Sequence, residues 1–193
     1  MIVPVAALIG LVCPAVLGGR LARLAGLRLR HVWVVVVAFA AQTVALMTLP
    51  GPRVLLAALH VASYAVAIWF VAVNRHVPGV VVVGTGALLN GLAITLNGGT
   101  LPASASALAA SGVHPDVGFV NSGFVAHPHL AVLGDVLAVP AGWPLANVFS
   151  IGDLLIVGAL TYLSLRVCGT WWTPHRAGAT RPDTRTVLPD TAS

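Results

Sequence analysis

The sequence contains no lysine and no glutamate, and charged residues of any kind are scarce. Of its 193 residues, 58% are hydrophobic and only 8% are charged, whereas a soluble domain usually has about a quarter of its residues charged. So little polar surface excludes an ordinary water-soluble domain and indicates a membrane protein. The two cysteines, Cys13 and Cys168, form neither a CxxC motif nor a zinc-ligand pattern.

Five long apolar stretches cover about 1–19, 32–49, 54–73, 80–96 and 150–167, and the first four contain no charged residue. A helix needs about 20 residues to cross a hydrocarbon core, with ~17 as the short limit. The stretches lack the alternation of apolar and polar residues that barrel strands show. The sequence therefore predicts an all-α polytopic membrane protein with five transmembrane helices in a membrane domain over 1–172. The remainder, 173–193, is rich in threonine, proline and arginine and predicts a disordered cytoplasmic tail.

All ten basic residues are arginine, and nine of them would share one side of the membrane. Only Arg53 falls on the other side. The positive-inside rule then predicts a bacterial plasma-membrane protein with its N-terminus outside and its C-terminus in the cytoplasm. The basic charge reflects this topology, so we expect the lipid bilayer as a partner and no nucleic acid. The nine are Arg20, Arg23, Arg28, Arg30, Arg75, Arg166, Arg176, Arg181 and Arg185.

The connection over 97–149 has no lysine or arginine, is longer than an ordinary loop and is too apolar for disorder. Pro102 and Gly112 delimit a predicted short helix within it. The later part, 129–149, is apolar but interrupted by prolines. It predicts an interfacial or re-entrant segment on the outer membrane face, with Trp143 as an interfacial anchor.

Asp153 opens the fifth apolar run and has two interpretations. Ser150 precedes it by three residues, which is the spacing of a helix capping box. Alternatively, Asp135 in the outer segment folds back beside Asp153. Two close carboxylates share a proton and can activate a water molecule, so this pair is our candidate catalytic pair.

Several polar or turn-forming residues are candidate binding residues near the same membrane face. Asn90 falls inside the fourth run, where an amide must be hydrogen-bonded, and we favour a bond between helices over a ligand contact. The turn after that run either stops the helix or exposes its backbone to a site. The candidates are Asn90, Asn97, Gly98, Gly99, Pro102 and Ser150.

Histidines in the outer connection offer a weaker possibility. His127 and His129 would face the same way on an extended segment, and with His114 and an aspartate, Asp116 or Asp135, they could hold zinc. No established zinc spacing matches, so we expect neither a metal nor a cofactor. His60 is an ionisable residue inside the third run, which makes it either functional or bonded to a carbonyl.

Two blocks carry a specific resemblance. "GALLNGLAITLNGGTLP" and "HPHLAVLGDVLAVPAGWPLANVFSIGDLLIVGA" resemble an uncharacterised family of bacterial multi-pass membrane proteins, which shares an NGGxxP block and two later GD blocks. The resemblance implies a polytopic fold and no known activity.

A second resemblance is local. "GALLN" at 86–90, "VLGD" at 132–135 and "FSIGD" at 149–153 are similar to blocks of lipoprotein signal peptidase, an intramembrane aspartyl peptidase. That resemblance implies that Asp135 and Asp153 are catalytic and that Asn90 is a site residue. The peptidase has Asp-Arg where this chain has Ala93 and Ile94.

The sequence thus predicts an integral membrane protein with a polar site on its outer face. We favour a binding role, for a protein or small-ligand partner, over catalysis. The alternative is an aspartyl peptidase-like hydrolase that uses Asp135 and Asp153. Whether the protein is an enzyme is left open by these residues.

Overall fold

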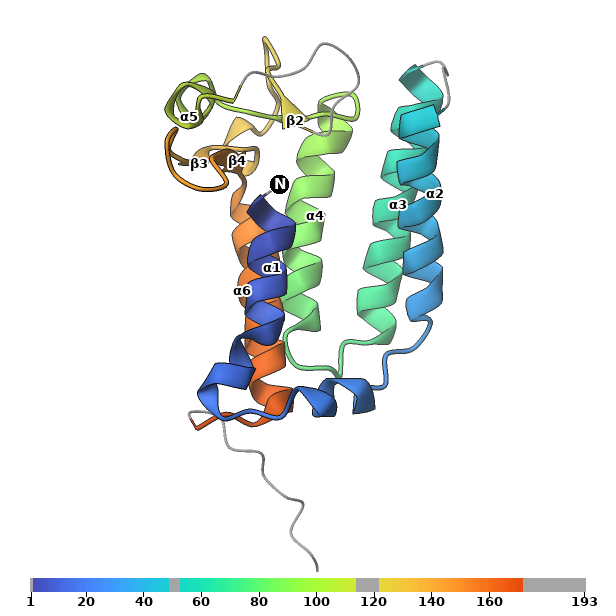
Figure 1. The fold of residues 1–193 in the computed structure, drawn as a ribbon. Coiled ribbons are helices and arrows are strands. Elements are labelled where there is room, and N and C mark those ends of the chain that lie inside the picture. Colours follow the sequence, from blue (N-terminus) through green and yellow to red (C-terminus); the bar gives the residue numbers. More distant parts are fainter. Residues whose placement is uncertain (1, 49–52, 114–121, 172–193) are drawn as a thin grey trace, which may run out of the picture.

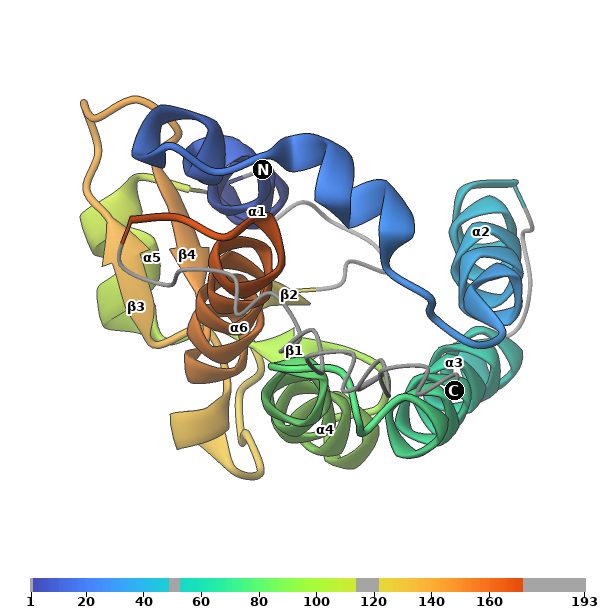
Figure 2. The same cartoon turned by 90° about the horizontal axis from the view of Figure 1, so that it is seen from below.

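A computed structural model of the chain describes residues 2–48, 53–113 and 122–171. Its long helices are α1 (Ile2–Val12), α2 (Val32–Thr48), α3 (Arg53–Val73), α4 (Val80–Leu96) and α6 (Ile151–Cys168). Short 3-10 helices η1 (Cys13–Leu17) and η2 (Leu21–Gly26) follow α1. In space the long helices form an open arc in the order α1, α6, α4, α3 and α2, and η2 crosses its base (Figures 1 and 2).

The segment between α4 and α6 forms a small cap over the ends of these two helices (Figure 1). It contains β1 (Leu101–Pro102), α5 (Ala105–Ser111), β2 (Ser122–Gly123), η3 (Ala131–Leu133), β3 (Leu137–Val139) and β4 (Asn147–Phe149). β1 pairs with β2 in parallel, and β3 pairs with β4 antiparallel. The cap therefore adds two small sheets, so the predicted all-α class is wrong in this segment.

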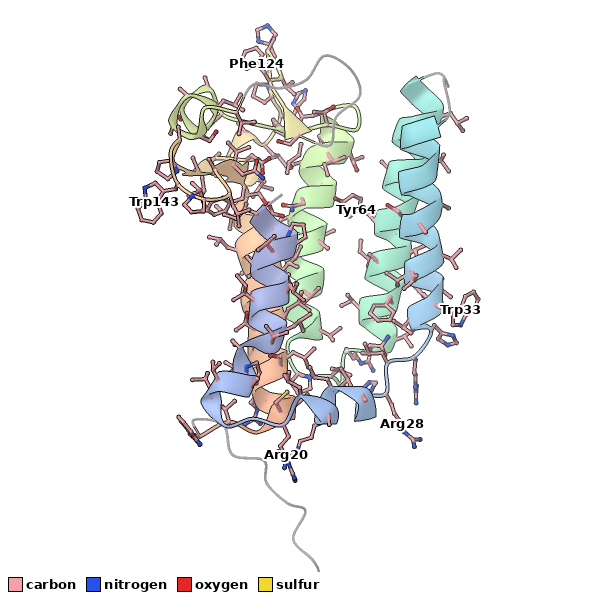
Figure 3. The ribbon with its side chains drawn as sticks, viewed as in Figure 1. Arg20, Arg28, Trp33, Tyr64, Phe124 and Trp143 are labelled. Carbon is pink, nitrogen blue, oxygen red and sulfur yellow. The ribbon has the colours of Figure 1, made fainter. Side chains whose placement is uncertain are left out.

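The predicted short helix in the cap is confirmed as α5, with a different start. The Ser104 hydroxyl accepts the backbone N–H of Ala107 at 3.1 Å and caps the helix. Gly112 ends it with φ +66°. Pro102 lies in β1 and not in the first helical turn. Trp143, the predicted anchor, is 69% exposed in the connection between β3 and β4 (Figure 3).

The prediction of five transmembrane helices is wrong. Among the described residues, one helix, α6, is long and apolar enough to cross a membrane by length and composition. Three other apolar helical stretches are shorter, namely Ile2–Leu17, Val61–Val73 and Val80–Leu96. The prediction assigned one transmembrane helix to each apolar stretch, but an apolar stretch does not always form one long helix. The first run changes to a 3-10 helix at Cys13, beside Pro14, and α4 ends after 17 residues at Asn97.

Close packing of α4 against α6 is the central contact of the arc, and it depends on glycine. A Cβ atom on Gly86 would lie 2.5 Å from the carbonyl oxygen of Gly152. A Cβ atom on Gly152 would lie 2.6 Å from the carbonyl oxygen of Gly86 and would overlap the side-chain oxygen of Asn90. Small residues let helix backbones approach in this way.

We therefore expect Gly86→Ala and Gly152→Ala each to lower the unfolding temperature in detergent. Forcing a methyl group into this contact should cost about 1–3 kcal/mol. Gly158→Ala is the matched control, because a Cβ atom there meets nothing within 4 Å on the same helix. Alanine should be neutral or stabilising at that position, by up to ~1 kcal/mol. Equal losses at all three glycines would contradict the close contact.

Candidate functional site

The start of α6 is a complete capping box. The Ser150 hydroxyl accepts the backbone N–H of Asp153 at 3.0 Å, and the backbone N–H of Ser150 donates to Asp153 Oδ2 at 3.0 Å. A carboxylate in the first turn also stabilises the positive end of the helix dipole. The capping interpretation of Asp153 is therefore confirmed.

Asn90 connects α4 to this cap through both ends of its amide. Its Nδ2 donates to Asp153 Oδ1 at 2.9 Å, and its Oδ1 accepts the Ser150 hydroxyl at 2.8 Å. Asn90 and Ser150 are both buried. The predicted role of Asn90 as a hydrogen-bonded link between helices is confirmed. Both oxygens of the Asp153 carboxylate consequently accept hydrogen bonds from the protein itself.

Asp135 lies in the cap, held against the strand that follows α4. Its backbone N–H donates to the Pro102 carbonyl at 2.8 Å, and its own carbonyl accepts the N–H of Ser104 at 3.0 Å. Gly134 permits this contact, because a Cβ atom there would overlap the Pro102 carbonyl oxygen. The structure thus brings the LGD segment and Pro102 together.

The Asp135 side chain is buried, with 3% of its surface exposed. Its Oδ2 accepts a short hydrogen bond from the Ser122 hydroxyl, whereas its Oδ1 is buried without a hydrogen-bond partner. A buried polar atom left unpaired costs ~1–3 kcal/mol. Unlike Asp153, Asp135 therefore has an oxygen able to accept a further donor.

Burial raises the pKa of Asp135 from 3.8 to about 6. The hydrogen bond from Ser122 lowers this pKa, and the nearby negative charge of Asp153 raises it further. The two carboxylates therefore interact electrostatically. They have different hydrogen-bond partners: Asp135 accepts from Ser122, whereas Asp153 accepts from Asn90 and Ser150.

The turn after α4 makes its side-chain hydrogen bonds to Ala93 and His129 and not to these acids. Asn97 Nδ2 donates to the carbonyls of Ala93 at 2.7 Å and His129 at 2.8 Å, and Asn97 Oδ1 accepts the N–H of His129 at 2.9 Å. Gly98 and Gly99 have φ of +67° and +96°, which glycine adopts without strain. This turn therefore joins α4 to the cap backbone and ends the helix.

The histidines do not form a metal site in the part of the chain that the structure describes. His127 and His129 are exposed, and no group of three or more His, Cys, Asp or Glu side chains gathers among these residues. His114 and Asp116 lie outside the described residues, as does the side chain of His60. The zinc hypothesis thus has no support from the described histidines.

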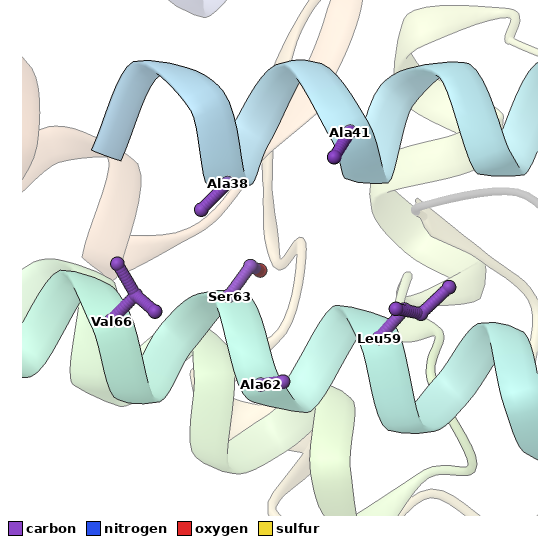
Figure 4. A pocket seen from close by; sticks show the side chains of 6 residues that line it. All are labelled: Ala38, Ala41, Leu59, Ala62, Ser63 and Val66. Atoms are coloured by element: carbon purple, nitrogen blue, oxygen red, sulfur yellow. The ribbon is translucent and has the colours of Figure 1, made fainter. Parts of the chain in front are cut away.

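A cavity of about 170 Å³ lies between α2 and α3, an interface separate from the α4–α6 contact (Figure 4). Its lining consists of small or apolar side chains: Ala38, Ala41, Leu59, Ala62, Ser63 and Val66. Such a lining offers little to bind a polar molecule. None of the residues around Asp135 and Asp153 lines this cavity.

Sequence reasoning missed Ser122, which bonds Asp135, and the strand pairing that positions it. Ser122 lies in a two-residue strand, and its spacing from Asp135 follows no motif. Pairing of β1 with β2, and of Ala103 with Asp135, brings the two side chains to the same place. No local signal in the sequence could have found this contact.

The raised pKa of Asp135 predicts a specific pH dependence of stability. Between pH 4 and 6 the folded protein binds more protons than the unfolded chain, so stability should fall as pH rises through this window. A shift from 3.8 to about 6 corresponds to about 3 kcal/mol. We expect Asp135→Asn to remove most of this slope in thermal unfolding measured against pH.

Asp153→Asn is the matched comparison for that measurement. It should lower the unfolding temperature at every pH, because it weakens the capping box, and it should keep most of the slope. If the slope of stability against pH disappears with Asp153→Asn but persists with Asp135→Asn, the titrating group is Asp153. That outcome would contradict the prediction.

Comparison with known proteins identifies a family. Residues 26–164 match the family of unknown function DUF5317. An uncharacterized protein of Thermotoga maritima is 29% identical over 122 residues, which cover 63% of this chain and 69% of the relative. No solved structure matches. These matches give no support to the resemblance to lipoprotein signal peptidase, whereas they confirm an uncharacterised family. The chain belongs to the DUF5317 family of unknown function.

Proposed function

We propose that this protein is a membrane-associated binding protein whose ligand is a small molecule with an ammonium group or another strong hydrogen-bond donor. The observation that carries the proposal is the buried Asp135 Oδ1, which has no hydrogen-bond partner. A donor placed beside this oxygen would satisfy it and would favour the ionised carboxylate.

The contrast between the two acids supports Asp135 as the binding residue. Asp153 already accepts hydrogen bonds at both oxygens, from Asn90 and from the Ser150 backbone. Its role is to hold the start of α6 and to add negative charge near Asp135. The Asn97 turn and Pro102 position the Asp135 segment without contacting the ligand themselves.

The distribution of charge supports a cationic ligand. The two described acids, Asp135 and Asp153, belong to the cap and to the adjoining start of α6. Arg20 and Arg28 lie at the opposite end of the molecule (Figure 3), and Arg166 is near the far end of α6. Arg53, which begins α3, is the described arginine at the end of the two acids, so the described charges there still sum to a negative value that favours a positively charged molecule.

Membrane association is supported by α6 and by the apolar surface around it. α6 has the length and composition of a membrane span, and large apolar side chains such as Leu8, Leu88 and Leu154 are exposed on α1, α4 and α6. We propose a bacterial plasma-membrane location in which the arginine-bearing end faces the cytoplasm. The polar site then lies at the outer face.

Small ammonium compounds test the binding proposal. Methylammonium and ethanolamine chlorides should raise the unfolding temperature of the full-length protein in detergent in a concentration-dependent way. Saturation at a hundred times the Kd would stabilise it by about 2.7 kcal/mol. Asp135→Asn should abolish the shift, and Asp183→Asn in the C-terminal tail should preserve it. A shift matched by sodium chloride, or retained in Asp135→Asn, would contradict the proposal.

A second candidate function is hydrolysis by the acid pair. One observation favours it: burial, with a smaller contribution from the negative charge of Asp153, raises the pKa of Asp135 to about 6, a range suited to a general acid. Against it, the hydrogen bonds that Asp153 accepts leave it poorly placed to activate a water molecule. We therefore rank this candidate second.

We expect no cleavage of a synthetic lipopeptide by the purified protein, measured by mass spectrometry of the products. The alternative predicts turnover that is lost in both Asp135→Asn and Asp153→Asn and retained in Asp183→Asn. That pattern, with both variants shown to be folded by a cooperative thermal transition, would establish the hydrolase and displace the binding role.

A further inference from the structure

The connection from η1 to α2 is a basic strap, defined here as residues 20–31, that crosses the end of the arc opposite the cap (Figures 1 and 2). In its second half leucine and arginine alternate. Leu27 and Leu29 pack against the buried cluster of Val77, Val80 and Leu163, whereas Arg28 and Arg30 are exposed. An extended segment with this alternation presents its apolar side to the protein and its charges outward.

Hydrogen bonds hold the strap at both ends. Near its start, the backbone N–H of Arg20 and the Arg23 guanidinium both donate to the Cys168 carbonyl, at 3.1 and 2.8 Å. Near its end, the fully buried Asn74 accepts the N–H of Arg30 at 2.7 Å and donates to the Arg30 carbonyl at 3.0 Å. The strap is therefore fixed in place before any partner arrives.

Three arginines of the strap remain exposed, Arg20, Arg28 and Arg30, and Figure 3 labels the first two. No described carboxylate lies at this end, because the described acids belong to the cap and the start of α6. Two tryptophans accompany the strap: Trp33 is 65% exposed and Trp171 is 75% exposed. Exposed arginine with exposed tryptophan matches the headgroup level of a bilayer, where indole rings and phosphates meet.

We propose that the basic strap is a docking surface for the phosphate groups of anionic phospholipids. Arg20, Arg28 and Arg30 supply the charge, and Arg23 and Asn74 are positioning residues that fix the backbone. Guanidinium groups bind phosphate through paired hydrogen bonds, so the strap selects anionic over zwitterionic headgroups. This inference rests on the proposed membrane association and is independent of the ligand at Asp135.

Native mass spectrometry of the delipidated, full-length protein in detergent tests the inference. We expect phosphatidylglycerol to bind more tightly than phosphatidylcholine, with a preference that weakens as salt increases. The triple variant Arg20→Gln, Arg28→Gln, Arg30→Gln should lose about a hundredfold of the phosphatidylglycerol affinity, given the contribution of each arginine near an anionic surface. It leaves Arg23 intact, so the bond to Cys168 is kept.

The matched control removes the same charge from elsewhere in the chain, as Arg176→Gln, Arg181→Gln, Arg185→Gln. It should keep the affinity, and an equal loss in this control would overturn the strap as the site. Lysine at the three strap positions should restore most of the affinity, and an unchanged unfolding temperature shows that each variant is folded.

Two further outcomes distinguish an anionic lipid from a different partner. If phosphatidylglycerol and phosphatidylcholine bind equally, the inference is overturned and the proposed membrane association still stands. If neither lipid binds, both the inference and the proposed membrane association are overturned. A duplex oligonucleotide that binds the wild type but not the strap variant, and displaces phosphatidylglycerol, would replace the lipid with nucleic acid as the partner.

Discussion

The contact between α4 and the start of α6 is the constraint on which the polar site depends. Gly86 and Gly152 let the two backbones approach, and the Asn90 amide fills the remaining space by bonding both Ser150 and Asp153. A buried amide stabilises the folded protein only if both its NH2 group and its oxygen have hydrogen-bond partners. The same bonds fix the first turn of α6. They thereby fix the position of the Asp153 carboxylate, whose negative charge raises the pKa of Asp135.

The cap also pairs its buried polar groups, but it leaves one unpaired. Backbone pairing with Pro102 and Ser104 sets the position of Asp135, and Ser122 satisfies one of its oxygens. The remaining oxygen is the only buried side-chain N or O atom of the described residues without a hydrogen-bond partner. The proposed binding role rests on this one unpaired atom in an otherwise satisfied set.

Local features of the sequence predicted the parts of the site that are local in the chain. The Ser150–Asp153 spacing indicated the capping box, and the buried position of Asn90 required a partner on another helix. The bond between Asp135 and Ser122 depends on the pairing of short strands, which leaves no periodic pattern to detect. The count of spans failed for another reason: apolar composition does not reveal that the first run changes to a 3-10 helix beside Pro14, and the run over 80–96, whose end the sequence predicts, forms a helix of only 17 residues.

The order of helices in the arc has a consequence for how the chain assembles during synthesis. Of the described helices, α1 is made first and its packing partner α6 last, and α6 then sits between α1 and α4. Early in translation α1 cannot yet pack on α6, and the face of α4 around Gly86 stays open until α6 arrives. A chain truncated before Ile151 would therefore expose both surfaces at once and be prone to aggregation.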